Sequence, residues 1–257
     1  MGIVTETRLR AMLAKGIPNP FILQAEEKLT PAAADFLKSR GIRIETSVKS
    51  SGRTLNAPSV YPLIPVGVSN RHVHLSRAHV ECLFGPGYTL TPDRALSQPG
   101  QYAAIETVTL QGPRGEIQRV RVLGPSRAET QVEISRTDGY LLGIHAPVRL
   151  SGNVAGTPGA VLVGPQGTLE LSHGVIVAEC HVHMSILDAA HFQVQNGDTI
   201  VVETPSDRSR RILFPQVIVR VHERYSLDFH IDLDEANAAG LRTGDFVERI
   251  AFQDQFS

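Results

Sequence analysis

The chain of 257 residues carries 25 basic and 26 acidic residues, and its 42% hydrophobic fraction is typical of a globular protein with a sizeable core. A formal net charge of −1 gives no electrostatic reason to expect a nucleic-acid or membrane partner, and no run of about 18 apolar residues is present that would cross a bilayer. Two cysteines, Cys82 and Cys180, favour a reducing compartment over a disulfide framework. Lys49 is the last lysine, so any anion bound after it must be held by arginine.

Residues 1–45 are expected to form a small helical extension. The segment "TETRLRAMLAKGI" is typical of a short helix with Thr5 as its N-cap. A second helix is predicted in "LTPAAADFLKSRGI", where Thr30 caps the helix and Pro31 occupies its first position. Residues 46–59 are polar and rich in Ser and Gly, which is the composition of a flexible linker.

From Tyr61 onward, short β-prone runs alternate with turns that contain Gly or Pro. Helical patterns are few and short, and they fall in "SRAHVECLFG", "SILDAAHFQ" and "LDEANAAGL". Many strands with little helix predict a mainly β fold of barrels or a sandwich, because an alternating βαβ fold would need a helix between successive strands.

The tripeptide His-Val-His occurs twice, at residues 72–74 and 181–183. Each copy is followed by a Ser that could cap a helix, a helical turn, a turn with Gly and a strand with Thr. This indicates the duplication of a β unit of about 100 residues, since the period exceeds that of solenoid repeats. We therefore expect two similar small β-barrels with a few short helices, the first made of residues 60–70 and 179–257 and the second of residues 71–178.

The two histidine pairs are candidate metal ligands. Residues i and i+2 of a strand point to the same face, so His72 and His74 aim together, as do His181 and His183. Two imidazoles at this spacing supply two nitrogens to Zn²⁺ or a similar metal.

Further ligands have to come from other strands. Glu133 in "TQVEIS" and His230 in "DFHIDL" each lie between two apolar residues and could each complete one pair. A surface carboxylate is the alternative for Glu133. Cys180 directly precedes its histidine pair and points to the opposite face, which favours a buried thiol of structural character.

Arginines that precede the predicted strand of Glu133 favour an anion site. Arg121 lies in "VRVLGPSRAETQVEIS", and Arg127 follows six residues later, after a Gly-Pro turn. A guanidinium can hold two phosphate oxygens at once, although a solvated surface arginine is the alternative. Arg114 in "GPRGE" is expected to be presented outward by a β-turn.

Four segments, "PVGVSNRHVHLS", "VRVLGPSRAETQVEIS", "AECHVHMS" and "DFHIDLDEANA", resemble the signature segments of the phosphate propanoyltransferase family, the PduL-type phosphotransacylases. Their order and spacing agree from about Leu63 to the C-terminus. The resemblance implies an enzyme that interconverts acyl-CoA plus phosphate with acyl phosphate plus CoA. It also implies two β-barrels around a dinuclear zinc site, in a homodimer.

The resemblance also implies roles for individual residues. One zinc ion would be held by His72, His74 and Glu133, and the other by His181, His183 and His230. Arg127 would bind phosphate and orient it for catalysis. CoA would be contacted by Val68, Ser69, Asn70, Arg114, Arg121 and Asn237, where Arg114 replaces a lysine that is common in the family. Cys180 matches a family cysteine beside the metals, and its role stays open.

Residues 1–45 depart from this core. They resemble the start of some cobalamin adenosyltransferases and related proteins of bacterial microcompartments, and family members often carry an N-terminal targeting peptide. The extension is thus either an address that binds shell or cargo proteins or a structural lobe. The expected location is the bacterial cytoplasm, with a microcompartment interior as one possibility within it.

Two other functions are open on the residues alone. A metal-dependent hydrolase of a thioester or amide also uses histidine pairs, and a zinc-stabilised module of a shell assembly would have no activity. Against the barrel of the amidohydrolases stand the lack of lysine after Lys49 and of a βα repeat.

Overall fold

The computed structural model describes residues 2–13, 17–24, 27–47, 63–205, 208 and 210–252. The chain divides into two compact units, Met1–Pro58 and Ser59–Ser257. Within the described residues, no helix combines the length and the apolar character needed to span a bilayer.

The first unit contains both predicted helices and also four short strands. The helices α1 (Glu6–Met12) and α2 (Pro31–Lys38) begin at Thr5 and Thr30, whose side chains accept hydrogen bonds from the helix backbone as predicted. Strands β1 and β3 pair in parallel, as do β2 and β4, and they share a small core with the helices; their bounds are Gly2–Val4, Phe21–Gln24, Glu27–Leu29 and Ile44–Ser47. The strands are three or four residues long, too short for a periodic sequence signal.

Most of the linker predicted at residues 46–59 lies outside the described residues. Thr46 and Ser47 belong to β4, and residues 48–59 lie outside the described residues.

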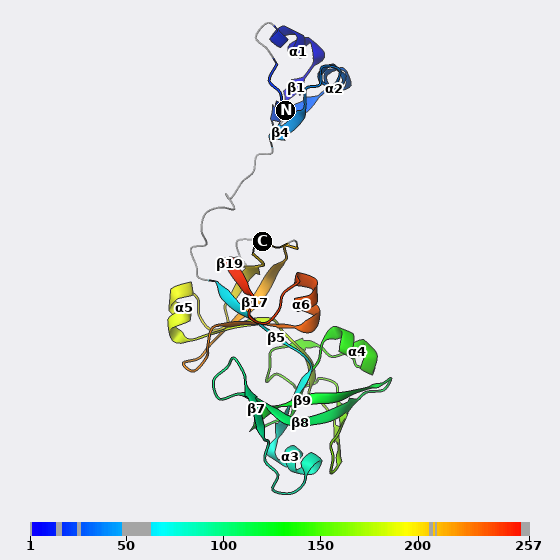
Figure 1. The fold of residues 1–257 in the computed structure, drawn as a ribbon, viewed down its shortest axis with the longest axis vertical. Coiled ribbons are helices and arrows are strands. Elements are labelled where there is room, and N and C mark those ends of the chain that lie inside the picture. The colour runs from blue at the N-terminus through cyan, green and yellow to red at the C-terminus, as the bar shows by residue number, and fades with distance from the viewer. Residues whose placement is uncertain are drawn as a thin grey trace. The chain divides into compact units, whose positions relative to one another are not determined.

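In the second unit, six strands form a closed barrel in the order β15-β17-β16-β19-β5-β18. Two short helices accompany it, α5 (Ile186–Phe192) and α6 (Leu233–Ala239), and Figure 1 shows both beside the barrel. The strands are β5 (Ile64–Ser69), β15 (His181–Met184), β16 (Thr199–Glu203), β17 (Leu213–Val221), β18 (Asp228–Asp232) and β19 (Phe246–Phe252).

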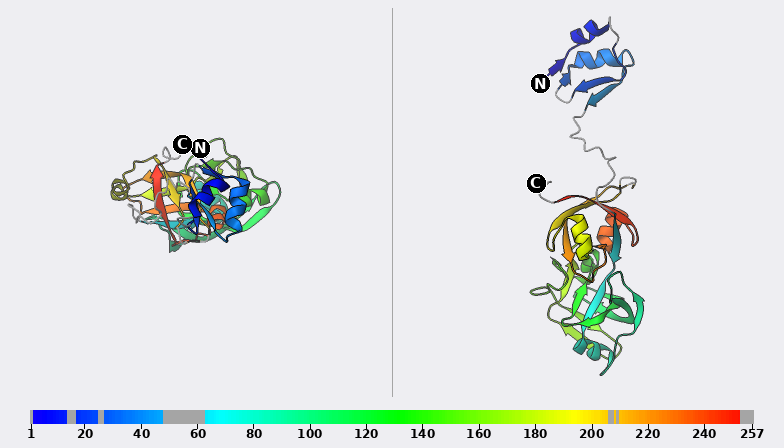
Figure 2. Two further views of the ribbon diagram at one scale, coloured as in Figure 1. Left: turned by 90° about the horizontal axis from the view of Figure 1, so that it is seen from above. Right: turned by 90° about the vertical axis from the view of Figure 1, so that its left-hand side faces the viewer.

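The rest of this unit is a curled nine-stranded sheet in the order β11-β14-β10-β6-β9-β8-β12-β13, with β7 paired to β8. The helices α3 (Arg77–Phe84) and α4 (Arg136–Leu142) lie beside it (Figures 1 and 2). Its strands are β6 (His72–Ser76), β7 (Pro92–Ala95), β8 (Tyr102–Gln111), β9 (Glu116–Arg127), β10 (Gln131–Glu133), β11 (Val148–Arg149), β12 (Ala160–Val163), β13 (Thr168–Leu171) and β14 (Val175–Ala178).

Strand pairing supports the predicted duplication. The run β14-β10-β6-β9-β8-β12 of the curled sheet repeats the run β5-β18-β15-β17-β16-β19 of the barrel, with the same alternation of parallel and antiparallel pairs. The two β units differ in closure, because β19 pairs with β5 whereas no pairing of β12 with β14 is found among the described strands.

The chain crosses between the two β units at the histidine strands. Strand β5 of the barrel runs into β6 of the curled sheet, and β14 of the sheet runs into β15 of the barrel. After each histidine strand a serine caps the next helix, Ser76 for α3 and Ser185 for α5, as predicted. Both histidine strands therefore start at the boundary between the two β units, and each is followed by a capped helix.

Candidate metal centre

Each β unit contributes one group of three candidate ligands, which we call the Glu133 triad (His72, His74, Glu133) and the His230 triad (His181, His183, His230). Within each triad the ligand atoms lie within 4.8 Å of one another. The third member comes from the neighbouring antiparallel strand, with Glu133 directly opposite His72 and His230 directly opposite His181. The third residue is thus paired with the first histidine in the same way in both triads.

Strand alternation explains why the triads face away from the hydrophobic cores. Val73 and Val182, which separate the histidines of each pair, are fully buried in the core of their own β unit. Val132 and Phe229, which directly precede Glu133 and His230, are likewise fully buried in these cores. Because successive side chains point to opposite faces, the ligands must lie on the other face of each sheet.

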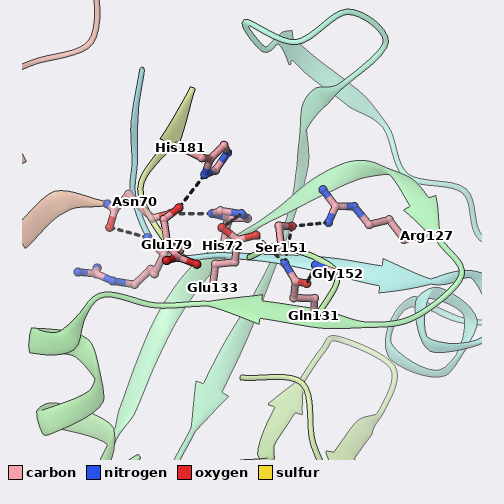
Figure 3. Close-up of polar contacts among 10 residues, drawn as sticks. Asn70, His72, Arg127, Gln131, Glu133, Ser151, Gly152, Glu179 and His181 are labelled. Atoms are coloured by element: carbon pink, nitrogen blue, oxygen red, sulfur yellow. Dashed lines mark hydrogen bonds and ion pairs between the residues drawn. The ribbon is translucent and has the colours of Figure 1, made fainter. Parts of the chain in front are cut away.

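Backbone carbonyls orient the first histidine of each pair, as Figure 3 shows. Nδ1 of His72 lies 2.8 Å from the carbonyl oxygen of Asn70, and Nδ1 of His181 lies 2.7 Å from that of Glu179. Each Nδ1 can donate its proton to the carbonyl, and in the neutral ring this leaves the lone pair on Nε2. Nε2 of His72 points at the Glu133 carboxylate, 3.3 Å away.

The second histidine of each pair has a buried nitrogen without a partner. Nδ1 of His74 and Nδ1 of His183 make no hydrogen bond within the described part of the chain. A buried polar atom of this kind is costly unless something binds it. A metal ion bound through Nδ1 would satisfy such an atom, so the donors of both triads fit a metal.

Protonation in the His230 triad favours metal binding. Burial, followed by the neighbouring histidines, lowers the pKa of His183 to about 2 and that of His181 to about 4. Burial also lowers the pKa of His230. All three rings are therefore neutral near pH 7, the form in which imidazole coordinates metals.

In the Glu133 triad the carboxylate and the two histidines shift one another's pKa values. Burial and the positive charge of His72 lower the pKa of His74 to about 2. Burial alone would lower the pKa of His72, but the Glu133 carboxylate outweighs it and raises that pKa. His72 in turn holds the pKa of Glu133 well below its usual range despite burial. Glu133 is therefore a negatively charged ligand.

Both triads line one cleft of about 1120 Å³ between the two β units. Five residues expected to bind substrate also line it, namely Val68, Ser69, Asn70, Arg121 and Arg127. Arg121 is held at the wall by a hydrogen bond from its Nη1 to the carbonyl of Ala104, at 2.7 Å.

Arg127 reaches the cleft from the end of β9. The predicted Gly-Pro turn before it is wrong, because β9 continues through Gly124 and Pro125 with a register irregularity against β6. The irregularity changes the pairing so that Arg127 lies opposite Ser76. Nη1 of Arg127 donates to Oγ of Ser151 at 3.1 Å (Figure 3).

Two residues expected to contact CoA lie outside the cleft. Arg114 is exposed on the β8–β9 turn, where its backbone N–H donates to the carbonyl of Leu142 at the end of α4. Asn237 is exposed on α6, and α6 is joined to α4 by a 2.8 Å hydrogen bond from the backbone of Thr137 to Asp234. Both residues thus lie on elements that contact α4, on the outer surface.

Cys180 packs partly buried against the barrel core, and its Sγ lies 3.5 Å from the carbonyl oxygen of Gln216. Burial and then the acidic groups of Glu235 and Glu179 raise the pKa of the thiol to about 12. The thiol is therefore protonated, and it is partly buried rather than fully buried.

Several residues in or next to the cleft were not identified from the sequence. Asp228, which lines the cleft, and Gln131, which is buried beside Glu133, each lie two residues before a candidate third ligand, and the i, i+2 spacing could have revealed them. Tyr225 packs edge-on against His183 with ring centroids 4.5 Å apart. Tyr225 and Ser151 come from loops, which carry no periodic signal.

The fold and the site define a protein of two β units with a pair of candidate metal-binding triads and several arginines, among them Arg121 and Arg127, in one cleft. A family model described as phosphate propanoyltransferase matches residues 65–242. A phosphate propanoyltransferase of Thermotoga maritima is 56% identical over 191 residues, which cover 74% of this chain and 90% of the relative.

Two further relatives carry the same name. That of Salmonella typhimurium is 55% identical over 177 residues, covering 69% of this chain and 83% of the relative. That of Rhodopseudomonas palustris is 50% identical over 184 residues, covering 72% and 80%. The chain therefore belongs to the phosphate propanoyltransferase family, which makes it an enzyme of the phosphotransacylase class; residues 1–64 lie outside the family match.

Proposed function

We propose that this enzyme interconverts acyl-CoA plus phosphate with acyl phosphate plus CoA, with propanoyl or acetyl as the acyl group, at a dinuclear zinc site. The observation that carries the proposal is the convergence of two complete triads and Arg127 on one cleft. The names of the relatives support the propanoyl group and phosphate as substrates.

Zinc is the metal that this donor set suits best. Five imidazoles and one carboxylate are ligands of the borderline kind that zinc prefers, and each triad leaves a position open for substrate. When bound, zinc would supply a Lewis acid for the thioester carbonyl and for the departing CoA thiolate.

Arg127 would hold the phosphate nucleophile. A guanidinium can grip two phosphate oxygens, and positioning the anion beside the carbonyl reduces the entropic cost of the encounter. In the forward direction a phosphate oxygen forms a bond to the acyl carbon while the carbon–sulfur bond breaks. We infer direct attack, since Cys180 keeps its proton and is packed against the core.

CoA would lie along the cleft wall formed by Val68, Ser69 and Asn70, with Arg121 beside it. Arg114 and Asn237 would contact a part of CoA that leaves the cleft and passes over α4. The exposed positions of both residues are compatible with such a path.

A homodimer and a microcompartment location belong to the same proposal. Exposed apolar side chains on the catalytic unit, Tyr140 and Leu141 on α4 and Ile186 and Leu187 on α5, are candidates for a subunit interface. The first unit has its own core and lies outside the family match, which suits a separate address for shell or cargo proteins in the bacterial cytoplasm. Unchanged co-sedimentation with shell proteins after deletion of residues 1–45 would contradict that address.

The proposed reaction is tested by the release of CoA thiol from propanoyl-CoA and acetyl-CoA, with and without phosphate, together with metal analysis of the same sample. We expect release that depends strictly on phosphate and two zinc ions per chain. Release in water without phosphate would favour a thioester hydrolase, and no release would favour a non-catalytic module.

Arg127→Ala sharpens this test. Loss of a charged hydrogen-bonding partner for phosphate is expected to lower kcat/KM by about 10²-fold. Arg77→Ala is the matched control, because Arg77 is an exposed arginine of α3 that pairs with Glu81 outside the cleft. Equal activity of both variants would remove Arg127 from the phosphate site.

A further inference from the structure

A second, smaller cavity opens beside the main cleft, and we call it the side groove. Its volume is about 340 Å³, and it shares His74, Arg127 and Tyr225 with the main cleft, so it reaches the same candidate metal centre. Its walls come from both β units. They are residues 98–101 between β7 and β8, residues 124–127 at the end of β9 and residues 222–225 between β17 and β18.

Burial along the side groove increases from the surface toward the triads. Pro99, His222 and Arg224 are exposed and form its outer part. His74 and Gln98 are buried and form its inner part, and His74 belongs to the Glu133 triad. A ligand that enters from solvent between the three loops therefore reaches this triad without passing the wall proposed for CoA, since residues 68–70 do not line the side groove.

Gln98 lies between the two cavities. It lines both of them and is 3% exposed. Its Nε2 donates to the carbonyl oxygen of Ser226 at 3.0 Å, and its Oε1 accepts from the backbone N–H of Ser226 at 3.2 Å. Because both ends of the amide are held, Gln98 is a fixed partition between the side groove and the main cleft.

The titratable side chains of the side groove favour an anion. Arg127, His222 and Arg224 line it, and none of the described residues that line it is a carboxylate. The main cleft differs, because five carboxylates line it together with five arginines. A groove lined by one sign of charge raises the local concentration of ions of the opposite sign.

Two donors at the outer part are available to such an anion. The backbone N–H of Arg224 donates to Nδ1 of His222 at 3.2 Å, so the neutral ring carries its proton on Nε2, which is a donor. Within the described part of the chain, the Arg224 guanidinium forms no ion pair. The loop itself is anchored, because the backbone N–H of His222 donates to the carbonyl oxygen of Met184 at the end of β15.

Size decides which substrate suits the side groove. A volume of about 340 Å³ lies at the small end of the range for sites of drug-sized ligands, so phosphate or a short acyl phosphate fits it better than CoA does. The main cleft, at about 1120 Å³, is the larger space.

We infer that the side groove is the route by which phosphate enters and acyl phosphate leaves while CoA occupies the main cleft. Arg224 and His222 contact the anion at the outer part of this route. The inference rests on the proposed function, because it takes phosphate and acyl-CoA to be the substrates. The ligand class is a small phosphate-bearing anion.

Two separate openings have a kinetic consequence. Phosphate does not have to pass CoA, so the enzyme with CoA bound still admits phosphate. Acyl phosphate can likewise leave before CoA does. A single shared opening would instead make CoA and phosphate exclude each other.

The first test compares Arg224→Gln, Arg224→Glu and Arg224→Lys with the same changes at Arg77, an exposed arginine outside both cavities. The kcat/KM for phosphate and the KM for acyl-CoA are measured on the full-length, metal-loaded chain at several salt concentrations. Arg224→Gln should lower kcat/KM for phosphate by about 5-fold and Arg224→Glu by about 10-fold or more, since the interaction of an exposed charge is lost or reversed.

This loss should shrink as the salt concentration rises, because salt screens exposed charges. Arg224→Lys keeps the charge and should restore most of kcat/KM for phosphate. The KM for acyl-CoA and the metal content should not change. Arg224 variants that behave like the Arg77 variants would overturn the inference. A raised KM for acyl-CoA in Arg224→Glu would overturn it as well, because CoA would then use the side groove.

The second test needs no turnover. Binding of inorganic phosphate to the full-length, metal-loaded chain is measured by calorimetry with and without saturating CoA, and the measurement is repeated for Arg224→Glu. Phosphate should bind within a few-fold of its ordinary affinity when CoA is present, and Arg224→Glu should weaken that binding. Competitive exclusion of phosphate by CoA would show that both use one opening and would overturn the inference.

The two tests separate this inference from the proposed function. If phosphate binds beside CoA and its binding depends on Arg224, but phosphate does not release CoA from acyl-CoA, the inference stands and the proposed reaction fails. If phosphate-dependent release occurs and the Arg224 variants match the Arg77 variants, only the inference fails. No phosphate binding by the unmodified chain would overturn both.

Discussion

The Glu133 triad and the His230 triad lie on equivalent strands of the two β units, yet their surroundings differ at several positions. The third ligand is a carboxylate in one and an imidazole in the other. Across the parallel neighbour strand, Ile176 lies opposite Glu133, whereas Gly67 lies opposite His230.

The residue two positions before the third ligand differs as well. In the curled sheet it is Gln131, which links Glu133 through Ser151 to Arg127. In the barrel it is Asp228, which accepts a 2.6 Å hydrogen bond from Ser97, a residue of the other β unit. Gln98, next to Ser97, exchanges two hydrogen bonds with Ser226.

The two β units thus keep the same geometry of the candidate ligands, whereas the residues that contact these ligands differ in what they join. The hydrogen bonds that start at Glu133 lead through Gln131 to Ser151 and Arg127, which both line the cleft. The support of the His230 triad joins the two β units across the cleft.

Removal of the third ligand should have the largest effect in both triads. Glu133→Ala and His230→Ala should each reduce the metal content from two ions to about one per chain, because two ligands seldom hold zinc. Activity should fall by about 10³-fold, since both ions would face the same substrate. Metal analysis and the phosphate-dependent assay measure this. Glu129→Ala is the control, because Glu129 is an exposed carboxylate that pairs with His173. Two ions retained in either triad variant would contradict the assignment of that ligand.

Gly67→Ala tests the close packing that is special to the His230 triad. A Cβ at this position would lie 2.6 Å from Oδ2 and 2.8 Å from Oδ1 of Asp228, so the carboxylate would have to move away from Ser97. Overpacking of this kind costs about 1–3 kcal/mol.

The register-matched change in the other β unit is Ile176→Val, which removes a methylene instead and costs about 0.5–1.5 kcal/mol. Thermal and denaturant unfolding of both variants measure the difference. If Gly67→Ala unfolds at the same midpoint as the unmodified chain, the glycine is not required by Asp228.

The smallest expected effect concerns the helices that follow the third-ligand strands. Both α4 and α6 begin with a capping box, Ser135 with Asp138 and Asp232 with Glu235. Asp138 also pairs with Arg71 at 2.9 Å. Glu235 lies next to acidic groups instead, and its burial together with the charges of Asp232 and Asp234 raises its pKa to about 7, against the opposing hydrogen bond from the backbone of Asp232.

A raised carboxyl pKa gives the stability a defined pH dependence. Below the pKa of about 4.3 in the unfolded chain, the Glu235 carboxyl is protonated in both the folded and the unfolded state, so it does not lower the stability. As pH rises from there to about 7, unfolding releases a proton and the stability falls. Glu235→Gln keeps an acceptor for the Asp232 backbone and should remove this component.

Unfolding free energies at pH 5 and pH 8 give the comparison. The unmodified chain should lose more stability between these values than Glu235→Gln does. An identical change in both would show that the Glu235 carboxyl titrates in its ordinary range.

Much of the site was predictable from local pattern. The period of two in a strand identified His72, His74, His181 and His183 as same-face pairs, and it marked Glu133 and His230 as polar residues between buried neighbours. The helix caps Ser76 and Ser185 followed from residue type and position. The curled, unclosed sheet was not predictable, because closure depends on whether two strands distant in sequence come into register.

The mainly β class, the duplication, the six candidate ligands and the family could be predicted from the sequence, since strand periodicity and motif order are properties of neighbouring residues. Which of the candidate residues come together depends on the fold. It brought both triads, Arg121 and Arg127 to one cleft, left Arg114 and Asn237 on the outer surface, and placed Ser151 and Gln131 between Arg127 and Glu133. The physical reason is that strand pairing and loop placement join residues far apart in the chain, and their contacts are set by packing and hydrogen bonding rather than by spacing.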